Sequence, residues 1–234
     1  MRNEYFKVIE ELLKEVEATQ SGNITIAGEM IAQSIMDGGI LQAFGSGHSF
    51  AAAIEITNRA GGLIPAKAIK EPAGGMYETI EGVGNLFLKR SDIRKKDIVV
   101  LISNSGRNPL PIEIALKCRE IGAKIIVVTS LESSKELSSK HSCGKNLWEL
   151  GDVVLDNRVM KGDSTIEVPG LPVRVCGTSS VSAAVMLNAA VLEAIQIMLS
   201  KGYVPPVYMS QNVDGGAEFN ERLTAKYADR LNRL

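Results

Sequence analysis

The sequence predicts an α/β domain in which a parallel sheet is covered by helices on both faces. Two observations predict it. Short apolar runs rich in β-branched residues recur along the chain, and stretches with helical periodicity separate them. Such runs are typical of strands buried on both faces. Strands that alternate with helices form a parallel, doubly wound sheet with right-handed crossovers.

The expected elements follow in order. Strands are expected at 40–44, 63–69 (the weakest), 97–103, 123–130 and 152–157. Helices are expected at 3–19, 24–37, 48–60, 109–121 and 179–200. Gly162, Asp163 and the stretch PGLPVRVCGTSS are expected to form the turn into helix 179–200, which Thr178 or Ser179 would cap. We therefore predict one domain over 1–202. A polar tail over 203–234, with a short helix at 217–232, would pack on the domain or on a partner subunit.

Composition and charge exclude several classes of protein. The formal net charge is −1, which gives no electrostatic footprint for nucleic acid or an anionic membrane. The three cysteines are widely spaced, so neither a disulfide framework nor a zinc site is expected, and a reducing compartment fits best. The amphipathic start has no apolar signal core, and helix 179–200 is interrupted by Asn188, Glu193 and Gln196. We expect a cytoplasmic protein with a core or interface helix at 179–200.

A glycine- and serine-rich segment follows the first expected strand. Gly45 and Gly47 permit a tight turn and a close approach of a ligand to the backbone. Ser46, His48 and Ser49 place two hydroxyls and an imidazole at the start of the next helix. The carboxyl ends of strands in such sheets are where ligands bind, so this segment is a candidate site.

A second segment, ISNSGRNP, repeats this arrangement one crossover later. A helix N-terminus with free N–H groups and neutral donors around it binds anions. Asn108 is a plausible N-cap before Pro109, which suits the first helical turn. The polar and glycine residues of this predicted phosphate loop are Ser103, Asn104, Ser105, Gly106 and Asn108.

Two other interpretations remain open for these segments. Each is also explained as a tight strand-to-helix turn with Ser and Asn caps. A dinucleotide site is weaker, because neither segment has a clean G-x-G-x-x-G pattern and a Walker A lysine is absent. Two such segments on successive crossovers favour a ligand site over turns alone.

The residues GSGHS, followed by a helix, and ISNSGRNPLPIEIALKCREIGAKIIVVTS resemble the SIS (sugar isomerase) domain family over roughly residues 24–200. The second segment is similar to N-acetylmuramic acid 6-phosphate etherases, and the first to phosphoheptose isomerases. The whole chain, including SQNVDGGAEFN, resembles the bacterial SIS proteins grouped as UPF0309.

The resemblance implies a flavodoxin-like three-layer α/β/α sandwich with five parallel strands, a bound phosphorylated sugar, and a homodimer or homotetramer. It implies that Ser103, Ser105 and Asn108 hold the phosphate. Gly45 and the residues Ser46 to Ser49 would face the sugar or complete the phosphate shell.

The chain departs from the family at three positions. Asn108 stands where Thr or Ser is usual, Arg59 where a catalytic or metal-binding Glu is usual, and Glu55 where heptose isomerases carry a metal-binding His. We therefore disfavour a zinc-dependent heptose isomerase and predict no metal and no cofactor.

Proton transfer needs an acid and a base. His48 is the best-placed titratable group, and Glu55 is a candidate base, although pairing with Arg59 at i,i+4 is the alternative. His141 is a further catalytic candidate, and Glu78 and Glu81, which follow the second expected strand, are further acid or base candidates.

The sequence thus predicts a phosphosugar-binding protein, most simply an aldose–ketose isomerase. The alternatives are a phosphosugar sensor without turnover and an etherase-like lyase that acts on an amino-sugar phosphate.

Overall fold

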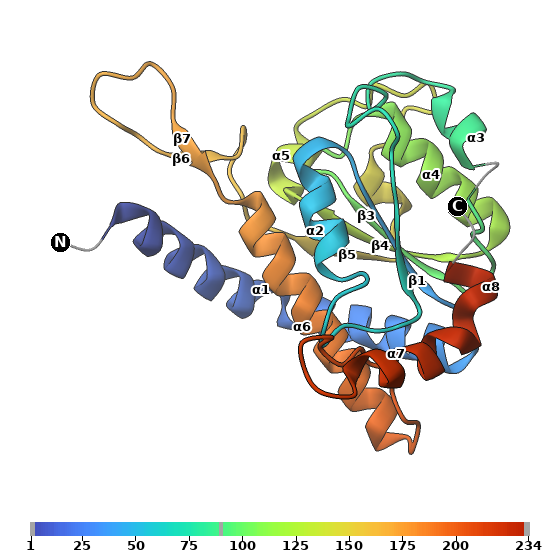
Figure 1. Ribbon diagram of the computed structural model, residues 1–234. Helices are drawn as coiled ribbons and strands as arrows, with labels where there is room; N and C mark the ends of the chain where they lie inside the picture. The colour runs from blue at the N-terminus through green and yellow to red at the C-terminus, as the bar shows by residue number, and fades with distance from the viewer. Residues whose placement is uncertain (1–2, 89–90, 232–234) are drawn as a thin grey trace.

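In the computed structural model, which describes residues 3–88 and 91–231, five parallel strands form one sheet in the order β2-β1-β3-β4-β5 (Figure 1). The strands are β1 (Leu41–Gly45), β2 (Ala66–Ile69), β3 (Ile98–Ile102), β4 (Lys124–Thr129) and β5 (Val153–Asp156). Every residue of β1 and β3 is buried, as expected for strands covered on both faces. The predicted doubly wound α/β class is confirmed.

The helices divide into two layers. One apolar cluster joins the sheet to α1 (Glu4–Met36), α2 (Phe50–Glu55) and α6 (Ser179–Ser200). A second cluster joins the opposite face to α4 (Pro109–Ile121) and the 3-10 helix η3 (Leu147–Leu150). The remaining short helices are η1 (Gly47–Ser49), α3 (Val83–Phe87), α5 (Leu131–Lys135), α7 (Gly216–Thr224), η4 (Ala225–Tyr227) and α8 (Ala228–Leu231).

The first helix differs from the prediction. A break was expected between 19 and 24, but α1 runs without interruption because tertiary contacts hold the middle of the helix. The Gln20 side-chain oxygen accepts from the Asp156 amide at 3.0 Å, and the Asn23 side chain donates to the Val154 carbonyl at 3.2 Å. Both contacts tie the helix to β5. Gly22, which lies in the expected break, is therefore part of the helix.

Two other predicted elements are shorter or different. The helix expected at 48–60 is a 3-10 turn followed by six residues of α2, and the chain leaves it through Asn58, which has φ +52°. The stretch expected as a turn into α6 contains an antiparallel hairpin, β6 (Ser164–Ile166) paired with β7 (Val175–Gly177). Periodicity does not reveal strands of three residues.

The cap of α6 also differs from the prediction. Thr178 occupies the N-cap position, but its hydroxyl makes no capping bond. The Asp163 carboxylate accepts from the Thr178 and Ser179 amides at 3.0 and 2.8 Å instead. A residue at the base of the hairpin therefore supplies the acceptor that a local Ser or Thr was expected to supply.

Helix α6 is long and apolar enough to cross a membrane by length and composition. In the structure it lies alongside α1, and its buried residues, Met186 and Leu187 among them, belong to the core of the sheet. Packing in the core of this fold accounts for its composition.

The C-terminal segment returns to the domain. The Ile64 amide donates to the Pro206 carbonyl at 2.8 Å, and Leu63 forms an isolated bridge with Val207. Helices α7 and α8 cover 216–231, close to the predicted 217–232, whose last residue lies outside the described residues.

Asp97, which precedes β3, is the anchor of this return. Its fully buried carboxylate accepts from the Gln42 side chain at 2.9 Å, from the Arg94 amide at 2.8 Å and from Arg230 Nη2 at 2.7 Å. The Ile40 amide completes the set at 3.1 Å. One carboxylate thus joins β1, β3 and α8 at the amino edge of the sheet, opposite to the carboxyl edge.

We expect Arg230→Ala to lower the free energy of unfolding by about 3 kcal/mol, because it leaves a buried carboxylate without its cation. Urea denaturation of the full chain measures this. Lys124→Ala, which removes the exposed pair with Asp152, should cost less than about 1 kcal/mol. Equal losses in the two variants would contradict the role given to Asp97.

Candidate functional site

The sheet has a topological switch between β1 and β3, which are hydrogen-bonded neighbours. The chain that leaves β1 enters α2 on one face of the sheet, and the chain that leaves β3 enters α4 on the other. A crevice opens between such diverging connections at the carboxyl edge, and ligands bind there. It lies between residues 46–49, here called the first loop, and residues 103–108, here called the second loop.

The first loop is held close to the sheet. A Cβ at Gly45 would lie 2.3 Å from the Ser49 carbonyl oxygen, so only glycine fits. The Ser49 amide donates to the Ser46 carbonyl at 3.1 Å, and Gly47 has φ +55°. His48 is exposed on this turn. The predicted tight turn at the start of a helix is therefore present.

The second loop is equally compact. Gly106 has φ +60°, and a Cβ there would lie 2.5 Å from Ser134 Oγ. Its amide donates to Ser103 Oγ at 3.3 Å, and its carbonyl accepts from the Leu147 amide at 2.7 Å. Helix α4 starts directly after Asn108, and Pro109 takes its first position, as predicted. The loop thus ends at the N-terminus of a three-turn helix.

Two asparagines of the second loop contact protein groups. The Asn104 side-chain oxygen accepts from Asn157 Nδ2 at 2.5 Å, and the Asn104 carbonyl accepts from the Ser130 amide at 3.2 Å. Asn108 occupies the N-cap position but makes no capping bond, contrary to the prediction. Its side-chain amide donates to Glu78 Oε1 at 2.8 Å. Neither the half-buried Ser105 hydroxyl nor the buried Nε of Arg107 has a hydrogen-bond partner among the described residues.

A small pocket connects the loops with α6. Ser49 and Ala52 line it from the first loop and α2, and Ile102 and Asn104 from the end of β3. Ser179 and Ser180, at the start of α6, line it too. Two predicted site residues, Ser49 and Asn104, are therefore brought together, and the sequence analysis missed the two serines of α6.

The segment that follows β2, residues 71–82, is here called the strap, and it contacts both loops. Glu71 is buried; its carboxylate accepts from Ser46 Oγ at 2.8 Å and from the Tyr77 amide at 3.0 Å. At its other end, Glu78 accepts from Asn108, and the Glu78 carbonyl accepts from the Leu110 amide at 3.2 Å. Sequence analysis missed Glu71, although its place directly after a strand was a usable signal.

His141 lies beside the second loop among carboxylates. Its side chain is 10% exposed, and its Nε2 is 3.6 Å from Glu81 Oε1 and 3.7 Å from Glu113 Oε1. Nδ1 accepts from the Cys143 amide at 3.0 Å, so Nε2 carries the proton in the neutral ring. The backbone amide of Lys140 donates to the Arg107 carbonyl at 2.9 Å. The structure thus brings together two candidates, His141 and Glu81, that the sequence analysis had named separately.

Glu81 and Glu113 are held by short contacts. Hydrogen bonds from the Ser142 hydroxyl and amide lower the pKa of Glu81 below its ordinary value. Glu113, buried in α4, accepts from the amides of Gly82 and Gly84. It was not predicted, since a carboxylate inside an amphipathic helix carries no sequence signal of burial.

Glu55 lies at the end of α2 and faces α6. Its carboxylate pairs with Arg59 and accepts from Asn188 Nδ2 of α6 at 3.1 Å. This is the pairing that the sequence analysis named as its alternative. A catalytic role for Glu55 stays a prediction, as it does for His48.

Among the described residues, no three His, Cys, Asp or Glu side chains lie close enough together to hold a metal ion. The titratable side chains near the loops include the histidines His48 and His141 and the carboxylates Glu71, Glu78, Glu81 and Glu113.

Comparisons with known proteins agree with this arrangement. The family model described as "SIS domain" matches residues 4–130. A UPF0309 protein of Listeria monocytogenes is 53% identical over 230 residues, which cover 98% of each chain.

Two solved structures share the fold. A phosphoheptose isomerase of Neisseria gonorrhoeae superimposes with a TM-score of 0.55 at 19% identity, covering 82% of this chain and 95% of the other. A Methanococcus jannaschii protein, inferred to be a 3-hexulose-6-phosphate isomerase, has a TM-score of 0.52 at 16% identity, covering 84% of this chain and 92% of the other. By the family match and the Listeria relative, this chain belongs to the SIS-domain family and, within it, to the UPF0309 proteins.

Proposed function

We propose that this protein binds a phosphorylated sugar in the crevice between the first and second loops and isomerises it between aldose and ketose. The observation that carries the proposal is the second loop, which ends at the N-terminus of α4 and holds an Arg107 Nε with no hydrogen-bond partner among the described residues. Ser49, Asn104, Ser179 and Ser180 line a cavity of about 10 Å³ beside it. That cavity has room for about one water, so the sugar would lie outside it, between the two loops. The names of the two solved neighbours support the same class of ligand.

The phosphate belongs at the second loop. The N-terminus of α4 supplies the positive end of a helix dipole there. Ser103 and Ser105 supply hydroxyls, and Asn108 supplies an amide now shared with Glu78. Arg107 adds a cation within the loop. Gly45, Ser46, Gly47 and Ser49 are then left for the sugar.

Isomerisation needs a base at the carbon beside the carbonyl and an acid for ring opening. We assign the base to Glu71, a buried carboxylate held 2.8 Å from Ser46 Oγ of the first loop. We assign the acid to His48 in the same loop. Glu55 is the competing base, and its contacts with Arg59 and Asn188 place it toward α6. His141 would act on the phosphate side, beside the second loop.

A phosphosugar sensor without turnover is the second candidate. The contacts of Glu55 favour the sensor, because its carboxylate is already bound by Arg59 and Asn188 and is not free to act as a base. For either function we expect a homodimer or homotetramer in the cytoplasm, with no nucleic-acid or membrane partner.

Ser105→Ala should weaken sugar-phosphate binding by more than about tenfold, since a hydrogen bond to a charged group contributes ~1.5–3 kcal/mol. Calorimetric titration with a panel of sugar phosphates, and with inorganic phosphate, measures the change. Ser200→Ala, at the far end of α6, is the matched control and should leave the affinity unchanged. An unchanged affinity in Ser105→Ala would remove the second loop from the site.

The reaction is tested by deuterium exchange. A sugar phosphate at about 100 times its dissociation constant should stabilise the protein by ~2.7 kcal/mol, a shift easily seen on heating. The ligand found in this way is then incubated in heavy water with the protein. We expect exchange at the carbon beside the carbonyl. A thermal shift without exchange would favour the sensor, and elimination of a substituent would favour the etherase-like lyase.

Four variants assign the acid and the base. Glu71→Gln and His48→Gln should each lower the exchange rate by about 100-fold or more, the usual contribution of a general acid or base. His141→Gln measures how much His141, beside the second loop, contributes to the exchange rate. Glu55→Gln should change the rate by less than about threefold, because its carboxylate faces α6. Loss of exchange in Glu55→Gln alone would overturn the assignment of Glu71.

A further inference from the structure

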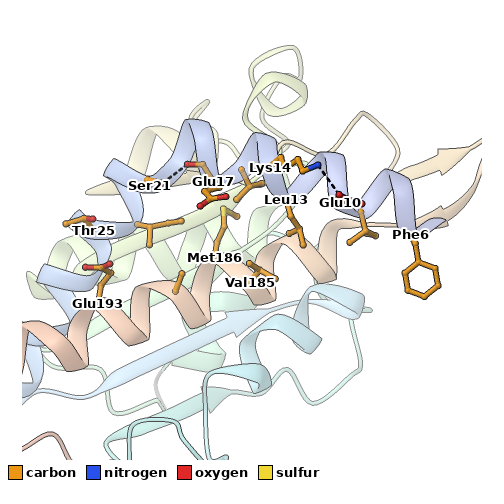
Figure 2. A pocket seen from close by; sticks show the side chains of 14 residues that line it. Phe6, Glu10, Leu13, Lys14, Glu17, Ser21, Thr25, Val185, Met186 and Glu193 are labelled. Atoms are coloured by element: carbon orange, nitrogen blue, oxygen red, sulfur yellow. Dashed lines mark hydrogen bonds and ion pairs between the residues drawn. The ribbon is translucent and has the colours of Figure 1, made fainter. Parts of the chain in front are cut away.

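Helices α1 and α6 lie side by side and leave an apolar groove along their outer surface. Figure 2 shows its lining, with Leu13 and Met186 between the helices and Phe6 near the start of α1. Phe6 and Val185 are 63% and 43% exposed. Leu192 and Leu199, further along α6, are also exposed. An uncovered apolar surface of this length marks an interaction site.

A second apolar surface lies on the hairpin formed by β6 and β7, here called the arm. Figure 1 shows the arm projecting away from the sheet beside the N-terminal end of α1. Three of its apolar side chains, Val168, Leu171 and Val173, are exposed. The Tyr5 hydroxyl, which donates to the Gly177 carbonyl at 2.9 Å, ties the base of the arm to α1. A two-stranded ribbon is marginally stable by itself, so the arm needs a surface to pack on.

The total surface is larger than a compact monomer of this mass requires. The chain exposes 11,914 Å², against about 10,300 Å² for a typical folded monomer of 25.2 kDa. The excess of about 1,600 Å² exceeds the ~800 Å² that each partner buries in a stable interface. The arm and the groove carry several of the exposed apolar side chains, and the strap and the C-terminal segment carry others, among them Met76, Ile80 and Val204.

We propose that a second copy of this chain covers both surfaces, with the arm of each copy lying in the α1–α6 groove of the other. The shape argues for a second copy: one chain carries a protruding apolar arm and an open apolar groove. In a dimer with a two-fold axis, the arm and the groove of each copy are both covered by the other copy. The proposal does not depend on which ligand binds at the loops.

The arm is also joined to the candidate site. Asp163, at its base, accepts from the amides of Thr178 and Ser179 and from the Ser179 hydroxyl at 2.8 Å. Ser179 lines the pocket between the loops. The base of the arm therefore fixes the start of α6, which forms one wall of that pocket.

Light scattering on the full chain tests the exchange. We expect an oligomer, and we expect Leu171→Glu in the arm and Val185→Glu in the groove each to raise the dissociation constant by about 100-fold, since each buries an unpaired charge. Leu86→Glu is the matched control, because Leu86 is 67% exposed on α3, in the other layer. Thermal unfolding confirms that the variants are folded. A monomeric wild type, or a dimer that survives Leu171→Glu, would overturn the proposal.

Cross-linking locates the contact directly. One preparation carries Leu171→Cys and another Val185→Cys, both with the exposed Cys143 and Cys176 replaced by serine. Mild oxidation after subunit mixing should join the two variants and leave each variant by itself unlinked. Cross-links within the separate preparations, and none in the mixture, would show that the subunits associate without placing the arm in the groove.

Discussion

The place of the candidate site depends on one constraint: β1 and β3 are neighbours whose chains must leave toward opposite faces of the sheet. The two loops therefore diverge from adjacent points, and each must turn within a few residues. A side chain at Gly45 would collide with the Ser49 backbone, and one at Gly106 with Ser134. The glycines are required by packing as well as by conformation, and they let the loops face each other across the crevice.

The strap turns these two loops into one connected structure. Glu71 accepts from Ser46 of the first loop, and Glu78 accepts from Asn108 of the second. Glu81 extends the connection to Ser142, and Glu113 of α4 accepts from the amides of Gly82, at the end of the strap, and Gly84. Hydrogen bonds to ionised acceptors are stronger than neutral ones. The strap is thus fixed by carboxylates to both loops.

Local sequence patterns predicted the sheet, helix α4 and both loops. Burial of a strand on both faces and the start of a helix each leave a recognisable pattern within a few consecutive residues. The contacts that the sequence did not reveal join distant positions. Ser46 and Glu71 are 25 residues apart, and Gln20 and Asp156, which keep α1 continuous, are 136 apart. Such pairs arise only when the sheet brings strand ends together. The buried Glu113, which accepts from Gly82 and Gly84, went unpredicted for the same reason. The arm went unpredicted because its strands are too short to show a period.

The hydrogen bonds of the second loop also restrict where an anion can bind. Ser103 Oγ accepts from Gly106, Asn104 is held by Asn157, and Asn108 donates to Glu78. Within the described part of the chain, the Ser105 hydroxyl and the Arg107 Nε have no such partners. A buried donor without a partner is costly, and Arg107 Nε is such a donor. Under the proposed function, an anion bound at the turn from Ser105 to Arg107 would supply the missing acceptor, and the nearby carboxylates would be left for the uncharged part of the ligand.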